Sequence, residues 1–505
     1  LSLPAIQKEQ SMYSAKSFTI QPRNEYSNFS FDESNRDVSD SHLEKIYDAI
    51  ENMYLLDVFP IVTDNNGVIQ DGQHRYTVAK YLKIPFYAIP GDIGIEDVSL
   101  TNRNTKPYST EDVLLMYAKM GMEPYVIANE IKEKYKRLPA GYIAKLLGCT
   151  SNDSFIESNF VITRLLYAKR VCRYLDDLSK IQKFVMSSSA YRCAIEFLAK
   201  TVEYDHSRMV DRASRIATRL ITAGTKDEAL EVLESIYNYN IREENRMEFK
   251  RFSINTEVEK PIGNCDRVQP TRGILHKYPV TVDSSMNYNE FSLHPCRREH
   301  STFSINAMIE SVRQSDWLHL YPIVVNEDMV ILDGQRRFEA AKALCKPIWY
   351  IQVKNVSMPM MIIAGTRKLS WSLKDYLKHY IKRGKQDYID LKMYIEHYGI
   401  ALNTYMLATD ELMLSVTYET FRRGDYKISN RKLLTEWSES ISRINNSVLR
   451  KYAATAFWRF LKSDSFKNKL PLVIEHINNH PTEWISLTRL EVSKKILTMG
   501  GMKSE

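Results

Sequence analysis

The chain has 505 residues, of which 44% are hydrophobic and 26% charged, as expected of a globular protein with several domains. Its 69 basic and 62 acidic residues give a net charge of +7, which permits a nucleic-acid partner but is too small for a dedicated polyanion binder. No apolar run has the roughly 18 residues of a membrane span, and the N-terminus lacks the pattern of a signal peptide. We therefore expect a cytoplasmic protein without a membrane partner.

Cysteine spacing excludes two further classes of protein. The six cysteines lie far apart and form no C-x-x-C pair, whereas disulfide scaffolds and zinc ribbons need close, patterned spacing. We predict reduced, mostly buried thiols.

The chain contains an internal repeat. Residues 59–89 (FPIVTDNNGVIQDGQHRYTVAKYLKIPFYAI) align without a gap with residues 321–351 (YPIVVNEDMVILDGQRRFEAAKALCKPIWYI). The same offset aligns residues 29–39 (FSFDESNRDVS) with residues 291–301 (FSLHPCRREHS). A shift of one residue then aligns 108–125 with 371–388. The sequence therefore predicts two tandem copies of one unit, which together fill the chain.

Each copy begins with the pattern of a small α/β domain. The order is helix, apolar strand, turn, second strand, the tripeptide Asp-Gly-Gln, second helix and third strand. The expected ranges are 41–53, 60–63, 67–70, 75–82 and 85–89 in copy one, and 303–314, 322–325, 330–332, 336–344 and 347–353 in copy two. Ser39 or Ser41, and Ser301, are the candidate N-caps of the first helices.

The remainder of each copy has the periodicity of amphipathic helices. A stretch with prolines and glycines but no helical period separates the copies. We therefore predict an α+β fold with α/β domains at 15–107 and 281–370, helical domains at 108–250 and 371–505, and a linker at 251–280.

The turn D-G-Q-x-R has features of a phosphate site. A strand that leads through Asp-Gly directly into a helix exposes backbone N–H groups at the helix N-terminus, where the helix dipole favours an anion. Gly72 and Gly334 lack a Cβ, which would allow a ligand close to the backbone. Arg75 and Arg337 lie in the first helical turn, where a cation is unfavourable unless an anion offsets it. The alternative is an ordinary turn capped by aspartate. The presence of D-G-Q-x-R in both copies, whose sequences otherwise diverge, favours anion binding.

This order of elements, together with D-G-Q-[HR]-R, resembles the ParB/sulfiredoxin-like nucleotide-binding superfamily, in particular a DGQHR-bearing branch of phage and mobile-element proteins. The resemblance implies bound ATP or CTP, with Mg²⁺ as a further candidate, in a bacterial or phage-infected cell. Sulfiredoxins have an attacking cysteine where Gln73 and Gln335 stand here, so their chemistry is not expected. The resemblance assigns nucleotide binding to Asn35, Arg36, Asp71, Gly72, Gln73, His74 and Arg75, and to Arg297, Arg298, Asp333, Gly334, Gln335, Arg336 and Arg337.

The candidates for catalysis are Asp71, His74 and Asp333. The two carboxylates could hold Mg²⁺ through water or could only cap the turn. His74 could transfer a proton near neutral pH, but the matching residue of copy two is Arg336, which favours a role for charge. The sequence predicts no metal site with certainty.

Residues 125–148 have the length of a helix-turn-helix, a module that follows the nucleotide domain in partition proteins. Lys132, Lys134, Lys136 and Arg137 would then contact the DNA backbone. Two helices packed in a bundle are the alternative interpretation.

The leading hypothesis is a nucleotide-binding, DNA-associated protein whose two fused copies form an internal pseudo-dimer, with further oligomerisation left open. One alternative is an enzyme, either an ATP-dependent nuclease or a phosphotransferase to a small substrate. The other is a scaffold or virion component that keeps the fold without the chemistry.

Overall fold

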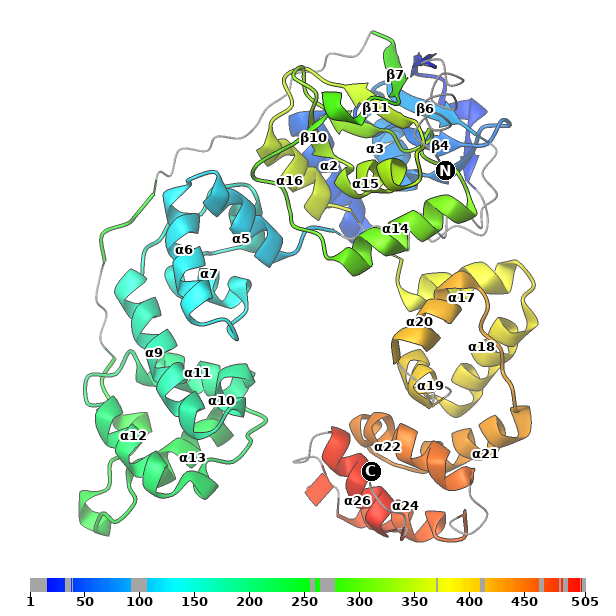
Figure 1. Cartoon of the computed structure of the whole chain (residues 1–505). Helices are drawn as coiled ribbons and strands as arrows, with labels where there is room; N and C mark the ends of the chain where they lie inside the picture. Colours follow the sequence, from blue (N-terminus) through cyan, green and yellow to red (C-terminus); the bar gives the residue numbers. More distant parts are fainter. Residues whose placement is uncertain are drawn as a thin grey trace, which may run out of the picture.

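The computed structural model describes residues 16–31, 38, 40–91, 107–254, 259–263, 278–368, 371–408, 414–462, 467–480, 483–484, 489–499 and 501. Within these residues the fold is a mixture of many helices and two small sheets, in agreement with the α+β expectation. The sheets lie together, and two all-helical parts extend from them (Figure 1). We call the sheet-containing parts the first unit (16–91) and the second unit (278–368), and the helical parts the first arm (107–254) and the second arm (371–499).

The two main sheets have the same strand order and the same strand directions. In each, two central strands are parallel and the neighbour on either side is antiparallel. The first sheet has the order β2 (Pro22–Arg23), β6 (Phe86–Pro90), β4 (Ile61–Thr63), β5 (Val68–Asp71) and β3 (Ser30–Phe31). The corresponding strands of the second are β7 (Val280–Ser285), β11 (Ile348–Gln352), β9 (Ile323–Val325), β10 (Val330–Asp333) and β8 (Ser292–Leu293).

The predicted helices of the two units are present. They are α2 (Asp40–Met53) and α3 (Gln73–Leu82) in the first unit, and α14 (Thr302–Gln314) and α15 (Gln335–Ala343) in the second. Ser301 caps α14 as predicted, because its hydroxyl accepts a hydrogen bond from the backbone N–H of Ser304 (3.3 Å). Ser39 and the Ser41 side chain lie outside the described residues. The second unit ends with a further helix, α16 (Met358–Thr366).

The N-terminal strand joins the two units. Strand β1 (Phe18–Ile20) pairs antiparallel with β7 and becomes the sixth strand of the second sheet. The backbone N–H of Lys16 also donates to Ser284 Oγ (2.9 Å). Strand β1 was not predicted from the sequence, because its pairing with β7 links segments more than 250 residues apart.

The arms are built almost entirely from helices, as the periodicity of the sequence predicts. The first arm contains α5 (Thr110–Lys119), α6 (Glu123–Lys134), α7 (Ala140–Leu147), α8 (Asn152–Ile156), α9 (Leu165–Ile181), α10 (Phe184–Ser187), α11 (Ser189–Leu198), α12 (His206–Arg215) and α13 (Lys226–Tyr237). The second contains α17 (Leu373–Lys382), α18 (Gln386–Tyr398), α19 (Leu402–Ala408), α20 (Leu414–Arg423), α21 (Arg431–Ser442), α22 (Ser447–Leu461), α24 (Leu470–Asn479) and α26 (Arg489–Met499).

Matched hydrogen bonds continue the repeat into the arms. The hydroxyl of Tyr125 donates to the carbonyl of Phe155 (2.6 Å), and the hydroxyl of Tyr388 donates to the carbonyl of Phe421 (2.7 Å). Both tyrosines are fully buried. Each therefore ties the second helix of its arm to a later segment in the same way, which agrees with the sequence alignment of the two copies.

Three clusters of buried side chains form the core. One cluster lies within the first unit, between its sheet and α2 and α3. A second, continuous cluster extends from the first arm through the second unit and also includes residues of the first unit, among them Met53, Val62 and Tyr87. A third cluster is confined to the second arm. The first arm thus shares its core with the unit of the other copy, whereas the second arm has a core of its own.

The described cysteines are free, as predicted, but the expectation that most are buried is wrong. Of the five that the structure describes, Cys172 is buried, Cys193 and Cys345 are exposed, and Cys149 and Cys296 are partly exposed. Their wide spacing identified them as unpaired thiols but did not reveal which helix face each one occupies. Among the described residues, no helix has the length and apolarity to span a membrane.

Candidate functional site

Both D-G-Q-x-R turns have the same backbone geometry. The strands β5 and β10 end at the aspartates, the glycines adopt left-handed φ values of 95° at Gly72 and 96° at Gly334, and helices α3 and α15 begin at the glutamines. A Cβ on Gly72 would lie 2.6 Å from Ile61 Cγ2, and one on Gly334 would lie 2.6 Å from Ile323 Cγ2. The missing Cβ therefore makes room for a strand isoleucine, so the expected close approach of a ligand on that side does not occur.

The arginines of the two turns form ion pairs with the aspartates of the same turns. Arg75 Nη2 lies 3.2 Å from Asp71 Oδ2, and Arg337 Nη2 lies 2.8 Å from Asp333 Oδ2. Arg75 also donates to the carbonyl of Phe59 (2.9 Å). The anion that offsets each cation at the helix N-terminus is thus supplied by the turn itself.

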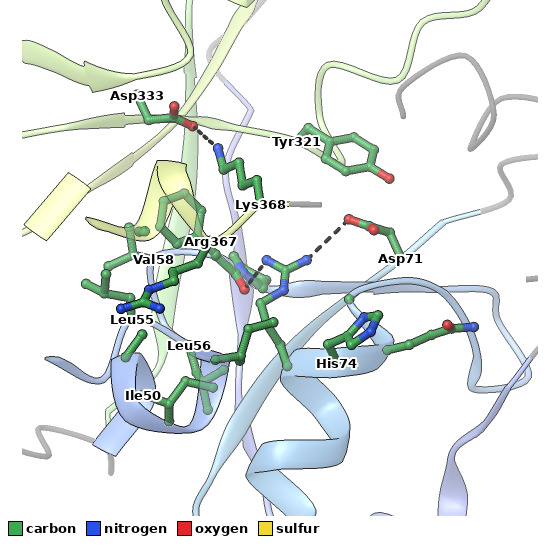
Figure 2. A pocket seen from close by; sticks show the side chains of 18 of the residues that line it. Ile50, Leu55, Leu56, Val58, Asp71, His74, Tyr321, Asp333, Arg367 and Lys368 are labelled. Atoms are coloured by element: carbon green, nitrogen blue, oxygen red, sulfur yellow. Dashed lines mark hydrogen bonds and ion pairs between the residues drawn. The ribbon is translucent and has the colours of Figure 1, made fainter. Parts of the chain in front are cut away.

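The two turns line one common pocket of about 240 Å³ (Figure 2). Its polar lining includes Asp71, Gln73, His74 and Arg75 of the first unit and Asp333, Arg337 and Lys368 of the second. Its apolar lining includes Ile46, Ile50, Leu55, Leu56 and Val58. The turns are far apart in the sequence, so their convergence was not predicted.

Lys368 extends into this pocket just beyond the end of α16. Its Nζ lies 3.4 Å from Asp333 Oδ2 (Figure 2). The same Nζ lies 5.1 Å from the centre of the Phe59 ring. Burial lowers the pKa of Lys368. Burial alone would raise the pKa of Asp333, but the positive charges of Lys368 and Arg337 outweigh it and hold the pKa at about 2. The carboxylate is therefore charged at neutral pH and shared between two cations.

The pocket carries an excess of positive charge. Arg367 also lines it, but its guanidinium pairs with Asp153 (3.5 Å) and Glu157 (3.2 Å) of the first arm. The remaining three cations, Arg75, Arg337 and Lys368, face only the two carboxylates of the turns. The described lining therefore leaves one cation in excess, beside the N-terminus of α3, where the helix dipole adds to it.

Each arm begins against the unit of the other copy. The backbone N–H of Tyr108 donates to the carbonyl of Gly365 (3.3 Å), and the Arg298 guanidinium lies 4.7 Å from the centre of the Tyr108 ring. Trp371, which aligns with Tyr108 in the repeat, lines the pocket together with residues of the first unit. The site thus takes side chains from both units and from the start of the second arm.

The copies differ at one pair of positions beside the turns. The rings of His42 and His74 lie edge to face in the pocket, with centroids 4.8 Å apart. The aligned residues of copy two are Ser304 and Arg336, where Arg336 Nη1 donates to Ser304 Oγ (3.0 Å). At these aligned positions the first unit therefore presents two imidazoles, and the second unit presents a hydroxyl and a guanidinium group.

The other residues assigned to nucleotide binding have different surroundings. Asn35 and Arg36 lie outside the described residues. Arg298, Gln335 and Arg336 line a second, smaller cavity in the second unit. Arg297 lines neither the pocket nor this cavity.

The predicted DNA-contacting cations lie at the end of α6 and in the turn that follows. Lys132 Nζ donates to the carbonyls of Lys136 (2.9 Å) and Leu138 (2.8 Å), so it stabilises the helix end. Lys134 lies against the Tyr135 ring, and Lys136 lies 3.9 Å from Glu133. The next helix, α7, buries most of its side chains in the first arm. The prediction of DNA contact by these cations stays a prediction.

Within the described part of the chain, no group of three or more His, Cys, Asp or Glu side chains is placed to hold a metal ion. Both aspartates of the turns already accept a hydrogen bond from an arginine.

Four residues that line the pocket were not predicted from the sequence: His42, Tyr321, Lys368 and Trp371. Trp371 could have been suspected from its alignment with an aromatic residue, Tyr108. Lys368 lies where the two copies align poorly, so no repeat pointed to it.

Comparison of the chain with protein-family models, with curated proteins and with solved structures gives no match.

Proposed function

We propose that this chain is a nucleotide-binding, DNA-associated protein made of two fused ParB-like copies, with ATP or CTP in the pocket that the units share. The phosphates would lie at the N-terminus of α3, near Lys368 and Arg337. The base and ribose would lie along the apolar wall that includes Ile50 and Leu56. Mg²⁺ is not part of the proposal, because both turn carboxylates are engaged by arginines.

The observation that carries this proposal is the convergence of both turns on one pocket. The pocket combines a helix N-terminus, an excess cation and an apolar wall. Ligand pockets typically have such a lining, mostly apolar with a few converging polar groups. Anions bind readily at helix N-termini, where the first N–H groups have no acceptor within the helix. A ligand with a phosphate end and an aromatic end matches both sides of the pocket.

Calorimetric titration of the full chain with ATP, CTP and GTP tests the proposal. We expect ATP or CTP to bind, and we expect Lys368→Met to weaken binding about tenfold or more, since hydrogen bonds to charged groups contribute strongly. Lys346→Met is the matched control, because Lys346 pairs with Asp316 (2.7 Å) in the same unit but outside the pocket. If the wild type binds no nucleotide, the proposal fails and the scaffold hypothesis remains.

DNA association has a separate test. Retention of DNA should fall steeply with salt if phosphate contacts dominate, and saturation of the pocket with the preferred nucleotide should change it. The changes Lys134→Ala and Arg137→Ala should reduce the salt dependence. Retention that responds to neither salt nor nucleotide would contradict the DNA part of the proposal.

One observation favours nucleotide hydrolysis as a second candidate function. His42 and His74 lie together in the pocket, and imidazoles transfer protons near neutral pH. We expect His74→Asn to abolish any release of inorganic phosphate from ATP or CTP while binding persists. If the wild type releases no phosphate, this candidate is excluded and binding alone remains.

A further inference from the structure

The second unit contains a smaller cavity of about 110 Å³ beside its D-G-Q-x-R turn. Residues of the second unit form most of its wall, and Tyr108 of the first arm completes the lining. The Tyr108 ring packs so closely on Gly365 that a Cβ there would lie 2.4 Å from it. The cavity could accommodate several water molecules or one small polyatomic ion, but not a nucleoside.

Two buried donors line this cavity without a partner. The Trp317 indole Nε1 and the Gln335 amide Nε2 make no hydrogen bond within the described structure. The side chains are only 2% and 6% exposed, respectively. Buried N–H groups nearly always have an acceptor, so two unpartnered donors on one cavity indicate a ligand that accepts hydrogen bonds.

The charges around the cavity favour an anionic acceptor. Arg298 and Arg336 both line it, and burial together with the positive charge of Arg298 lowers the pKa of Arg336 to about 10. His300 is neutral, since burial and the charge of Arg336 lower its pKa to about 4. Asp333 is the carboxylate among the lining residues, and it is shared by Arg337 and Lys368. Arg298 pairs with Asp112 (3.2 Å) behind the cavity.

We propose that this cavity binds one tetrahedral oxyanion, with inorganic phosphate as the test ligand, held by the Trp317 and Gln335 donors and by Arg336. Water suits the cavity less well than an oxyanion, because a water molecule must also donate hydrogens while the wall presents mainly donors and cations. The first N–H groups of α15, which begins at Gln335, add to the attraction. The site does not depend on nucleotide binding in the larger pocket, although Lys368 and Arg337 line both.

Titration of the full chain with inorganic phosphate, by calorimetry and by thermal unfolding, tests this proposal. We expect saturable binding and a rise in Tm with phosphate concentration. Gln335→Leu removes one donor with little change in volume, and Trp317→Phe removes the indole N–H but leaves a smaller ring, so each should weaken phosphate binding about tenfold or more. Tyr108→Ala should open the cavity, speed phosphate release and admit pyrophosphate.

Two matched controls separate loss of the site from general damage. Trp458→Phe removes an indole N–H that is also buried and unpartnered, but that lies in the second arm. Gln314→Leu makes the other substitution on the exposed surface of α14. Both should bind phosphate as the wild type does.

Three outcomes would overturn the proposal: no phosphate binding by the wild type, unchanged binding by Trp317→Phe and Gln335→Leu, or displacement of all phosphate by ATP at a single shared site. Retention of ATP binding by Trp317→Phe would show that the two pockets act separately. Failure of one proposal therefore leaves the other testable.

Discussion

The glycine of each turn has a structural function that motif analysis alone would assign to the ligand. Gly72 combines a φ of 95° with a side that faces Ile61 at a distance too short for any Cβ. The positive φ and the missing Cβ together allow Ile61 of β4 to pack against the start of α3. The residue type is therefore required by the fold, and the ligand gains from it only indirectly, through the placement of the helix N-terminus.

Gly72→Ala should accordingly destabilise the chain more than a glycine change in open space. A left-handed alanine costs about 1–2 kcal/mol, and overlap with a packed side chain adds about 1–3 kcal/mol. Gly121→Ala is the matched control, because Gly121 also has a positive φ (78°), but a methyl group there would have no neighbour within 4 Å. Urea unfolding, followed by circular dichroism, measures the free energy of unfolding of both variants. Equal losses would show that the Ile61 side chain moves enough to accommodate the added methyl group.

Asp333 should make stability depend on acid pH. Its pKa is about 2 in the folded chain against an ordinary 3.8. Because the folded pKa is the lower one, the charged carboxylate stabilises the fold fully above about pH 4 and loses this contribution as the pH falls toward about 2. The shift corresponds to up to about 2 kcal/mol. The difference in unfolding free energy between wild type and Asp333→Asn should shrink over that range, and a difference independent of pH would contradict the assignment.

At the scale of elements, the sequence predicted those helices and strands whose own residues carry a hydrophobic pattern. The apolar steps of α2 and α14 and the apolar runs of β4 and β9 were identified because each carries its own periodicity. Strands β1, β3 and β8 are as short but include polar residues, so they form no apolar run, and each is paired with a strand distant in the sequence.

The candidate site was predictable to the same extent. The geometry of each turn follows from its own five residues, and both turns do line cavities. Their meeting in one pocket, and the arrival of Lys368 and Tyr108 from other elements, depend on how the units pack. No pattern within one copy contains that information.

The first helices of the two arms offer a matched pair of substitutions. Asp112 and Asp375 each complete a capping box, with Ser109 and Ser372 respectively. Asp112 Oδ2 additionally accepts from buried Arg298 (3.2 Å) of the second unit.

Asp112→Asn should therefore cost about 2 kcal/mol more than Asp375→Asn, because it also weakens a buried ion pair. Thermal unfolding of the two variants measures the difference. Equal effects would show that the ion pair between Asp112 and Arg298 adds nothing to stability.

At the scale of the whole molecule, the two arms are packed asymmetrically. The first arm shares a continuous core with the second unit, and the ion pairs of Arg298 and Arg367 reinforce this contact. The second arm has a separate core that extends from Trp371 to Leu497. The second arm follows Arg367 and Lys368 in the sequence, and both of these residues line the pocket. A ligand in the pocket would therefore lie next to the connection between the second unit and the second arm.

A separate core predicts separate unfolding. We expect calorimetry of the full chain to show at least two transitions, because elements that share no core do not unfold as one cooperative unit. A fragment of residues 371–505 should reproduce one of them and keep its helical circular dichroism.

A fragment of residues 107–263 should be less stable than the same segment in the full chain, since it loses the second unit that completes its core. A pocket ligand should raise the transition of the units and first arm more than that of the second arm. A single transition for the full chain, with an unfolded 371–505 fragment, would show that the second arm depends on the rest of the molecule.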